Sequence, residues 1–283
     1  MSMKIFPLPE WADIAEEISR TGGVTMVIGN VDSGKSTLAR HLARRLAESA
    51  AVGVVDADVG QSSLCIPGTV AAALFRTRED AEAYRCDRFA FVGTASPVHA
   101  VKPIIDATAY FVEALRKEAA GVVVDTGGLV AGYVGKGLKL AKIRRLQPDR
   151  IIAIQREDEC EEILRCLDEV LVYRLSPSPH VSTRNREARA RYRLMKMRRF
   201  MEDQELWEHL LPERVDIRRV GPAGGRNVAI PPGTLVGLND GNITRDIGVV
   251  EEGGEPFLIK CHLRSLKDIN RVIIGDLSMS EQT

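Results

Sequence analysis

The segment Gly29–Thr37 constrains this chain more than any other, because it reads G-N-V-D-S-G-K-S-T and has the spacing G-x-x-x-x-G-K-[ST]. It follows an apolar run, residues 24–28, and precedes a stretch with helical periodicity, residues 38–46. A strand, a tight loop and a helix in this order allow backbone N–H groups and the helix N-terminus to surround a phosphate chain. The sequence therefore predicts a nucleoside triphosphate site, whereas a glycine-rich turn without a nucleotide is the alternative.

Within this loop the residue types indicate separate tasks. Lys35 is expected to reach the β- and γ-phosphates, and the Ser36 hydroxyl to bind Mg²⁺. ATP and Mg²⁺ are thus the expected cofactors. The predicted nucleotide-binding residues are Gly29, Asn30, Asp32, Ser33, Gly34, Lys35, Ser36 and Thr37.

Composition sets broad limits on the class of protein. The chain has 283 residues, 45% of them hydrophobic and 28% charged, which suits one large α/β domain with a small annex. The formal net charge is zero, so a nucleic-acid partner cannot be argued from overall charge. No apolar run approaches the roughly 18 residues that a membrane span needs, and no signal-peptide layout is present, so we expect no membrane partner. The five cysteines form no C-x-x-C pair, so we expect reduced thiols and a cytoplasmic location.

Short apolar runs alternate with helical patterns after the phosphate loop. The expected strands are 52–55, 89–92, 122–124, 150–154 and 169–173, and the expected helices are 8–20, 102–117, 136–146 and 157–166. Residues 66–69 are expected to form a loop, and the charged stretch 76–88 to be irregular. This alternation predicts a P-loop α/β fold with a parallel sheet covered by helices on both faces.

The chain changes character near residue 176. Residues 176–211 are rich in arginine and are expected to form a long helical lid that begins near Ser182. From residue 212 short β-like runs alternate with turns, which predicts a small β-rich C-terminal domain, residues 212–283, after a kinase domain of residues 1–211. The β-like runs are 216–220, 227–230, 234–238, 246–250, 257–261 and 272–274.

Polar motifs follow several of the predicted strands, where ligands of parallel sheets bind. Asp58, in D-A-D-V-G-Q, can bind Mg²⁺ or accept a proton from an attacking hydroxyl, and Asp56 lies two positions earlier. Gln61 can contact phosphate, Mg²⁺ or the attacking group. Asp125, which follows the apolar run 122–124, can hold the metal through water. Turn formation is the alternative for each of these residues.

Arginines of the predicted lid are the remaining candidates. Arg184, Arg189 and Arg193 are spaced by five and four residues, approximately one helical face, and the planar guanidinium suits phosphate oxygens. A solvated basic face is the alternative, and it suits Arg186, Arg191 and Arg198, as do contacts with a nucleic-acid backbone. The histidines His99 and His180 have no paired ligand or triad spacing, so structural or solvent-facing roles are expected for them.

Five segments in order resemble one known family. They are G-N-V-D-S-G-K-S-T, D-A-D-V-G-Q-S-S-L-C-I-P-G-T, G-T-A-S-P, D-T-G-G-L-V-A-G-Y-V-G-K-G and R-N-R-E-A-R-A-R-Y-R. Together they resemble the polynucleotide 5′-hydroxyl kinase family, which includes the RNA kinase subunit of the eukaryotic mRNA 3′-end cleavage factor and its archaeal relatives. The resemblance covers about residues 22–200 and, more loosely, the run L-V-G-L-N-D of the β-rich domain.

The resemblance implies transfer of the γ-phosphate of ATP to the 5′-hydroxyl of RNA, sometimes DNA, in RNA processing or repair. Asp58 then corresponds to the general base and lies near the metal, as Ser36 does. The resemblance assigns catalytic roles to Lys35, Asp58, Arg184 and Arg189, and it places Gln61, Thr126, Gly127 and Arg193 on the substrate side.

Two features depart from the family. Leu129 stands where the family usually has a tryptophan that stacks on the terminal bases of the substrate, an interaction worth roughly 1–3 kcal/mol per base. The separate N-terminal β domain of the eukaryotic members has no counterpart, which predicts a compact, free-standing enzyme with a different partner assembly.

The sequence thus supports a polynucleotide 5′-hydroxyl kinase that uses ATP and Mg²⁺ and acts on RNA or DNA ends. A nucleotide-binding switch or adaptor, an ATPase or GTPase without kinase activity, is the alternative from another class. The run 155–158, Q-R-E-D, is not the N-K-x-D of a guanine reader, which argues against a GTP switch. A small-molecule kinase is a third possibility, against which the arginine-rich helix argues. No motif identifies a protein partner.

Overall fold

A computed structural model describes residues 5–211, 215–221, 230–241, 243–253 and 257–280. The chain divides into two compact units. The first contains residues up to 58, 71–88 and 105–184, and the second contains residues 59–70, 89–104 and 185 onward. The predicted boundary between residues 211 and 212 adjoins residues 212–214, which lie outside the described residues, so it stays a prediction.

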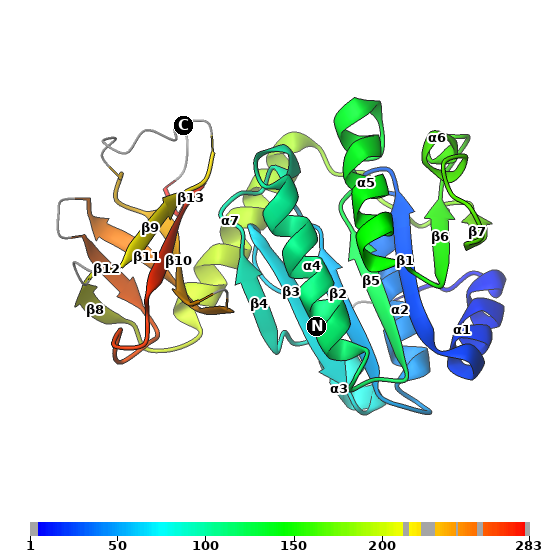
Figure 1. Ribbon diagram of the computed structural model, residues 1–283, viewed down its shortest axis with the longest axis horizontal. Helices are drawn as coiled ribbons and strands as arrows, with labels where there is room; N and C mark the ends of the chain where they lie inside the picture. The colour runs from blue at the N-terminus through cyan, green and yellow to red at the C-terminus, as the bar shows by residue number, and fades with distance from the viewer. Residues whose placement is uncertain (1–4, 212–214, 222–229, 242, 254–256, 281–283) are drawn as a thin grey trace. The chain divides into compact units, whose positions relative to one another are not determined.

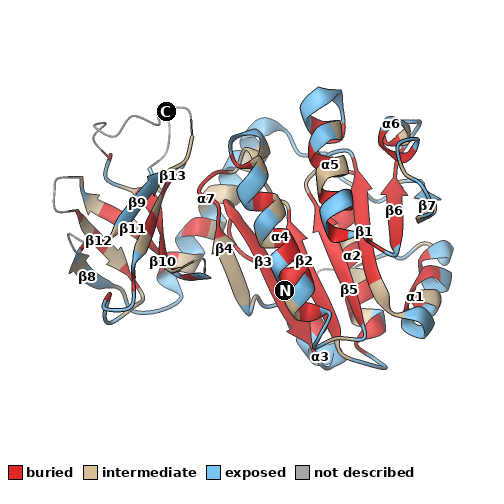
Figure 2. Ribbon diagram, viewed as in Figure 1, coloured by how far each residue is buried: buried red, intermediate tan, exposed pale blue. Residues whose placement is uncertain are grey.

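A seven-stranded sheet with the order β4-β3-β2-β5-β1-β6-β7 carries the phosphate loop. Its strands are β1 (Gly23–Gly29), β2 (Val52–Ala57), β3 (Thr69–Phe75), β4 (Arg88–Phe91), β5 (Gly121–Thr126), β6 (Arg150–Ile154) and β7 (Leu171–Leu175). Strands β2, β5, β1, β6 and β7 run parallel to one another, as predicted. All residues of β2, β5 and β6 are buried, because helices cover both faces of the sheet (Figures 1 and 2).

Helices alternate with these strands. They are α1 (Pro9–Thr21), α2 (Lys35–Leu46), α3 (Arg78–Ala83), α4 (Val101–Leu115), α5 (Gly132–Leu146), α6 (Glu161–Leu164) and α7 (Arg186–Glu202), with a 3₁₀ turn at Pro97–His99. Figure 1 shows α2 behind β1 and β5, with α5 in front of them. None of the helices in the described part of the chain is long and apolar enough to cross a membrane.

Two local features differ from the expectations. Residues 66–68 form the expected loop, but Thr69 already begins β3 (Thr69–Phe75), which is antiparallel to β2 and which the sequence patterns do not predict. The run T-V-A-A-A-L-F is weak strand sequence, and its pairing with β2 decides its conformation. The charged stretch after it contains α3, which Thr77 and Asp80 start with a reciprocal capping box. The sheet is therefore mixed rather than wholly parallel.

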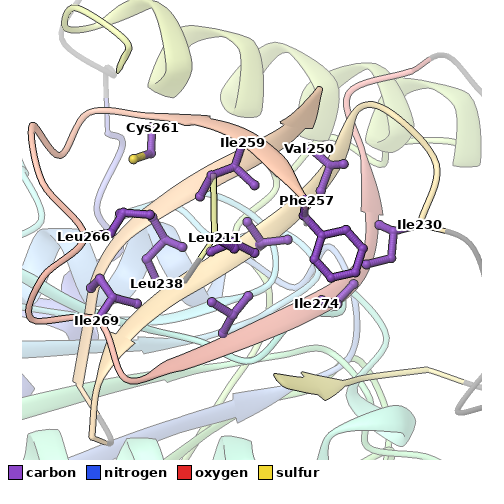
Figure 3. Packing of buried hydrophobic residues seen from close by; sticks show 12 residues of the cluster. Leu211, Ile230, Leu238, Val250, Phe257, Ile259, Cys261, Leu266, Ile269 and Ile274 are labelled. Atoms are coloured by element: carbon purple, nitrogen blue, oxygen red, sulfur yellow. The ribbon is translucent and has the colours of Figure 1, made fainter. Parts of the chain in front are cut away.

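A second sheet follows α7, with the order β8-β12-β11-β10-β13-β9. Its strands are β8 (Trp207–Leu210), β9 (Asp216–Arg219), β10 (Thr234–Asp240), β11 (Ile243–Glu252), β12 (Leu258–Cys261) and β13 (Arg271–Ser278). Among the described residues, the strands of this sheet pair antiparallel, except that β9 is parallel to β13. Buried side chains such as Leu238, Phe257 and Ile259 form its hydrophobic core (Figure 3).

The C-terminal predictions hold for most strands. The predicted strand 227–230 lies almost wholly outside the described residues. The predicted helical stretch 176–211 was too long, because α7 ends at Glu202 and Trp207–Leu210 is a strand that pairs with β12. Trp207 is a residue type enriched in strands, and pairing with β12 decides the conformation of this exposed segment.

Candidate active site

The phosphate loop has the predicted strand–loop–helix context. β1 ends at Gly29 and α2 begins at Lys35. Gly34 has φ of 94°, and a Cβ there would lie 3.1 Å from Val181, so glycine is required by conformation and by space. The Lys35 Nζ donates to the Asn30 carbonyl at 2.6 Å. The ammonium is thus held over the loop, where a phosphate chain would bind.

Strand order brings three carboxylates toward this loop. β2 is not adjacent to β1, because β5 lies between them. Asp56 on β2 is opposite Asp125 on β5, and both are fully buried. The backbone N–H of Asp58 donates to Asp56 Oδ1 at 3.0 Å. Three charged side chains therefore lie side by side near the carboxyl ends of these strands: Lys35 after β1, Asp125 on β5 and Asp58 after β2.

Charge and burial act strongly on this cluster. Burial raises the pKa of Asp125, Asp56 raises it further, and the value reaches about 7 although Ser36 and Lys35 lower it. Burial lowers the pKa of Lys35, while Asp125 and Asp58 oppose that shift. The Ser36 hydroxyl is the side-chain donor that acts on Asp125, but neither buried oxygen has a hydrogen bond of ordinary geometry. A cation or a proton would compensate the burial of a carboxylate with so few donors.

These residues fit Mg²⁺ in the way that nucleotide sites bind it. Among the described residues, no group of three His, Cys, Asp or Glu side chains can hold a metal ion by itself. Mg²⁺ at phosphate sites takes only one or two protein ligands beside phosphate oxygens and water. The Ser36 hydroxyl and the unpaired Asp125 oxygens offer such ligands. The metal roles of Ser36 and Asp58 stay predictions.

The turn after β5 packs tightly between the loop and Asp58. A Cβ on Gly128 would lie 2.6 Å from Val31 Cγ2, so the turn reaches the phosphate loop only because it has no side chain there. A Cβ on Gly127 would lie 3.5 Å from Asp58 Oδ1. Gly127 thus lies against the predicted general base. The hydroxyl of the buried Thr126 donates to the Val27 carbonyl at 2.7 Å, so its proton points into the sheet.

Sequence reasoning missed two residues of this site. Lys139 and Lys142 of α5 are each only 1% exposed. Lys139 Nζ donates to Thr126 Oγ1 at 3.0 Å and to the Gly127 carbonyl at 2.5 Å. Lys142 Nζ is 3.4 Å from the Ala57 carbonyl. The available signal was their position in the helical repeat that also contains the buried Leu138 and Ile143.

Desolvation dominates the titration of both lysines. Burial lowers the pKa of Lys139 well below its ordinary value, and the neighbouring Lys142 and Lys35 lower it further. Burial also lowers the pKa of Lys142, to about 8, against the opposing effect of Asp58, Asp56 and Asp125. The buried amines of Lys139 and Lys142 thus contact the end of β5 and the end of β2.

Arg184 lies beside the phosphate loop, but not on the helix. Its backbone N–H donates to Asp32 Oδ2 at 3.0 Å, and the nearby Val181 lies against Gly34. Asn185 caps α7 by accepting from the Ala188 N–H at 2.8 Å, so the helix begins at Arg186 rather than near Ser182. The expectation that Arg184 shares one helical face with Arg189 and Arg193 was therefore wrong.

The remaining predicted residues belong to the second compact unit. There α7 packs on the loop that contains Gln61, since Tyr192 Oη donates to the Ser62 carbonyl at 3.4 Å and Lys196 Nζ to the Ser63 carbonyl at 3.3 Å. Burial lowers the pKa of Arg193, and Arg186 and Arg189 lower it further, so these guanidiniums lie close together. The residues half-buried on α7 include Arg189 and Arg193, whereas Arg186, Arg191 and Arg198 are exposed.

An exposed aromatic residue lies in the segment where the family tryptophan is replaced. Leu129 is half-buried, and residues 131–134 are all exposed. Tyr133 in this run is 94% exposed, in the first turn of α5 (pale blue in Figure 2). The two histidines have structural contacts: His99 Nδ1 is 3.3 Å from Asp276 Oδ2, and the His180 ring packs on Phe6.

The chain is similar to known proteins in sequence and in fold. The family model described as the mRNA cleavage and polyadenylation factor CLP1 P-loop matches residues 29–203. The chain belongs to this family. The match contains every predicted site residue, from Gly29 to Arg193.

Curated relatives include proteins of archaea and plants. The chain is 32% identical over 199 residues to a polyribonucleotide 5′-hydroxyl-kinase of Pyrococcus horikoshii, covering 68% of this chain and 54% of that protein. It is 30% identical over 274 residues to a CLP1 homolog of Arabidopsis thaliana, covering 84% of this chain and 60% of that protein. The chain thus spans about half the length of the archaeal relatives it matches.

A solved structure supports the fold. The wild-type Clp1p–Pcf11p complex matches with a TM-score of 0.78 at 10% identity, over 98% of this chain and 80% of that chain. The family has a P-loop fold with a second sheet in the C-terminal region, which is the architecture observed here. A P-loop kinase family also implies the use of ATP.

Proposed function

We propose that this chain is a polynucleotide 5′-hydroxyl kinase that transfers the γ-phosphate of ATP to the 5′-hydroxyl of RNA or DNA, in RNA processing or repair. The observation that carries the proposal is the placement of Asp58. It directly follows β2, beside Gly127, within a cluster that also contains Lys35 and Asp125. A carboxylate at this place can receive a proton from an acceptor hydroxyl, which a nucleotide-binding adaptor does not need.

In the proposed reaction, the 5′-oxygen attacks the γ-phosphorus while its proton passes to the Asp58 carboxylate. The new oxygen–phosphorus bond forms as the bond to the β,γ-bridging oxygen breaks, and ADP leaves. Lys35 neutralises charge on the β- and γ-phosphates, and Arg184 and Arg189 are proposed to do so from the lid. Gln61, Thr126, Gly127 and Arg193 are proposed to serve the acceptor side. Because the hydroxyl of Thr126 bonds to Val27, its part there is to shape the turn.

We propose that Ser36 and Asp58 hold Mg²⁺, with Asp125 acting through water. When bound, Mg²⁺ would neutralise charge that develops on the transferring phosphoryl group. The buried and unpaired oxygens of Asp125 support this proposal, since a nearby divalent cation would compensate their burial.

We propose that the Tyr133 ring stacks on the terminal base of the substrate. Leu129 has no π-face, whereas the exposed Tyr133 ring lies a few residues after the turn that contacts Asp58. Base stacking on an aromatic ring tolerates any base and is worth roughly 1–3 kcal/mol per base. RNA as the substrate is supported by the archaeal relatives named polyribonucleotide 5′-hydroxyl-kinase.

Location and partners extend the proposal. All five cysteines are free, which supports a cytoplasmic setting. The proposal includes a protein partner, because the solved structural neighbour is a Clp1p–Pcf11p complex.

The experiment incubates the protein with γ-labelled ATP, Mg²⁺ and 5′-hydroxyl RNA and DNA oligonucleotides. Asp58→Asn is expected to lower label transfer by roughly 10²–10⁴ while ATP still binds, because the base contributes mainly to the transfer step. Asp13→Asn, an exposed residue on α1, is the matched control and should transfer label as the wild type does. ATP hydrolysis without label on any oligonucleotide would overturn the kinase proposal and favour the adaptor.

A further inference from the structure

The strongest unassigned feature is the pair of lysines inside α5. Charged side chains are almost never fully buried without a partner, and burial of an amine is costly. Lys139 and Lys142 nevertheless occupy the face of α5 that packs on the sheet, between Leu138 and Ile143. Leucine or methionine at these positions would fill the same space without that cost. A reason other than packing is therefore needed.

Their contacts converge on the two strand ends that flank the acceptor side. Lys139 Nζ donates to both Thr126 Oγ1, 3.0 Å away, and the Gly127 carbonyl, 2.5 Å away. The Thr126 hydroxyl in turn donates a hydrogen bond to the Val27 carbonyl on β1, so a chain of hydrogen bonds links α5, β5 and β1. Lys142 Nζ reaches the Ala57 carbonyl at 3.4 Å, one residue before Asp58.

Geometry connects these bonds to the proposed base. Gly127 lies close enough to Asp58 that a Cβ on it would be 3.5 Å from Oδ1 and 3.7 Å from Cγ. Movement of the Thr126–Gly127 turn would therefore change the packing of Gly127 against the Asp58 carboxylate. The phosphate loop touches this turn through Gly128, but neither lysine bonds to the loop itself.

We propose that Lys139, assisted by Lys142, is a positioning residue that fixes the Thr126–Gly127 turn and the end of β2, and through them the direction of the Asp58 carboxylate toward the acceptor hydroxyl. The proposal rests on the proposed kinase function and deepens it. It assigns the acceptor side of the reaction to α5, as the phosphate loop and α2 serve the donor side.

The test compares Lys139→Met with Lys136→Met, a matched change on the solvent side of the same helix, where Lys136 pairs with Glu162 at 3.8 Å. In steady-state transfer of labelled phosphate to a 5′-hydroxyl RNA oligonucleotide, Lys139→Met is expected to lower kcat by about 10- to 100-fold, because small misplacement of a reacting group is costly. The KM for ATP and the ATP affinity are expected to stay within about twofold of the wild type. Lys136→Met should change neither.

A double-mutant cycle separates positioning from general destabilisation. Thr126→Val removes the hydroxyl that joins Lys139 to β1, and it should lower kcat in the same direction. If Lys139 acts through this turn, the double variant should lose little more than Lys139→Met alone, instead of the product of the two losses. Thermal unfolding of each variant, in parallel, measures stability.

The outcomes distinguish the two proposals. Wild-type kcat in Lys139→Met, losses that multiply in the cycle, or a loss of ATP affinity as large as that of kcat would each overturn the positioning role alone. An unfolded Lys139→Met leaves Thr126→Val and Lys142→Met to decide by the same criteria, and wild-type kcat in both would overturn the role. Absence of label transfer by the wild-type protein would overturn the proposed function, and this inference with it.

Discussion

Two lysines approach the same carboxylates from neighbouring strand–helix units, and they differ in how the chain presents them. Lys35 starts α2 after the phosphate loop and bonds to the Asn30 carbonyl of that loop. Lys139 lies two turns inside α5 and bonds across to Thr126 and Gly127. The first lysine serves a loop that is contiguous in sequence, whereas the second serves residues 12 and 13 positions away.

This difference separates the donor side of the site from the acceptor side. The donor side needs a fixed loop shape around phosphate, which a short motif encodes in one place. The acceptor side needs a carboxylate held in direction, and here β2, β5 and α5 each contribute a part. The comparison therefore predicts different kinetic signatures for changes at the two ends.

The largest expected effect comes from an arginine of the predicted lid rather than from either lysine. Arg189→Ala should lower phosphate transfer by about 10³-fold while ATP affinity changes far less, because an arginine at the transferring phosphoryl group acts mainly in the transition state. Arg191→Ala, on the exposed side of α7, is the control. Equal loss of transfer and ATP binding would contradict a catalytic lid arginine.

The donor end is tested by Lys35→Ala. We expect transfer to fall by roughly 10²–10³, as on removal of one preorganised charge-stabilising donor, together with a clear loss of ATP affinity in calorimetry. This double loss contrasts with Lys139→Met, for which ATP affinity should be kept. If Lys35→Ala bound ATP as tightly as the wild type, the division into donor and acceptor sides would be wrong.

The carboxylate between the two ends can be tested through pH. The pKa of Asp125 is raised from 3.8 to about 7 in the folded protein, so the folded state keeps a proton that the unfolded state releases at lower pH. Stability should therefore fall as pH rises from about 4 to 7 and then level off. Asn at this position has no proton to release.

The measurement is chemical unfolding of the wild type and Asp125→Asn without nucleotide or Mg²⁺ between pH 5 and 8. The unfolding free energy of the wild type should drop relative to the variant by about 2 kcal/mol over this range. Curves that stay parallel would show that Asp125 is ionised throughout.

The smallest expected effect concerns the exposed ring near the acceptor end. Tyr133→Ala should raise the KM for a 5′-hydroxyl oligonucleotide by about tenfold, as expected for loss of one stacked base, with the KM for ATP unchanged. Tyr133→Phe keeps the π-face and should behave as the wild type. A KM for the oligonucleotide that is unchanged in Tyr133→Ala would remove this ring from the site.

Most of the framework was predictable from local patterns. Strand 150–154 was predicted to the residue, and α2 follows the phosphate loop as its spacing indicates. The antiparallel strand β3 was not predictable, because the A-A-A run has low β-propensity and only its partner β2 decides its conformation. The start of α7 was misplaced because the Asn185 cap looked like any other polar residue in an arginine-rich run.

The site was predictable to the extent that its residues belong to compact motifs. Lys35, Ser36 and Asp58 were found because each ends or follows an apolar run at a known spacing. Asp125 was expected beside the metal, but its position between β1 and β2 follows from the order of strands in the sheet. Lys139 and Lys142 could not be assigned, since a lysine in a helical repeat ordinarily reaches solvent.

By itself, the sequence determined the alternation of strands and helices and the family, and it predicted the triphosphate site. Those depend on contiguous segments, in which backbone conformation and side-chain spacing are local properties. Only the tertiary structure decided that β5 separates β2 from β1, that Arg184 precedes its helix, and that two buried lysines meet Gly127 and Ala57. These features depend on which strands pair and which helix face the sheet covers, and the free energy of burial that selects them is a property of the whole packed core.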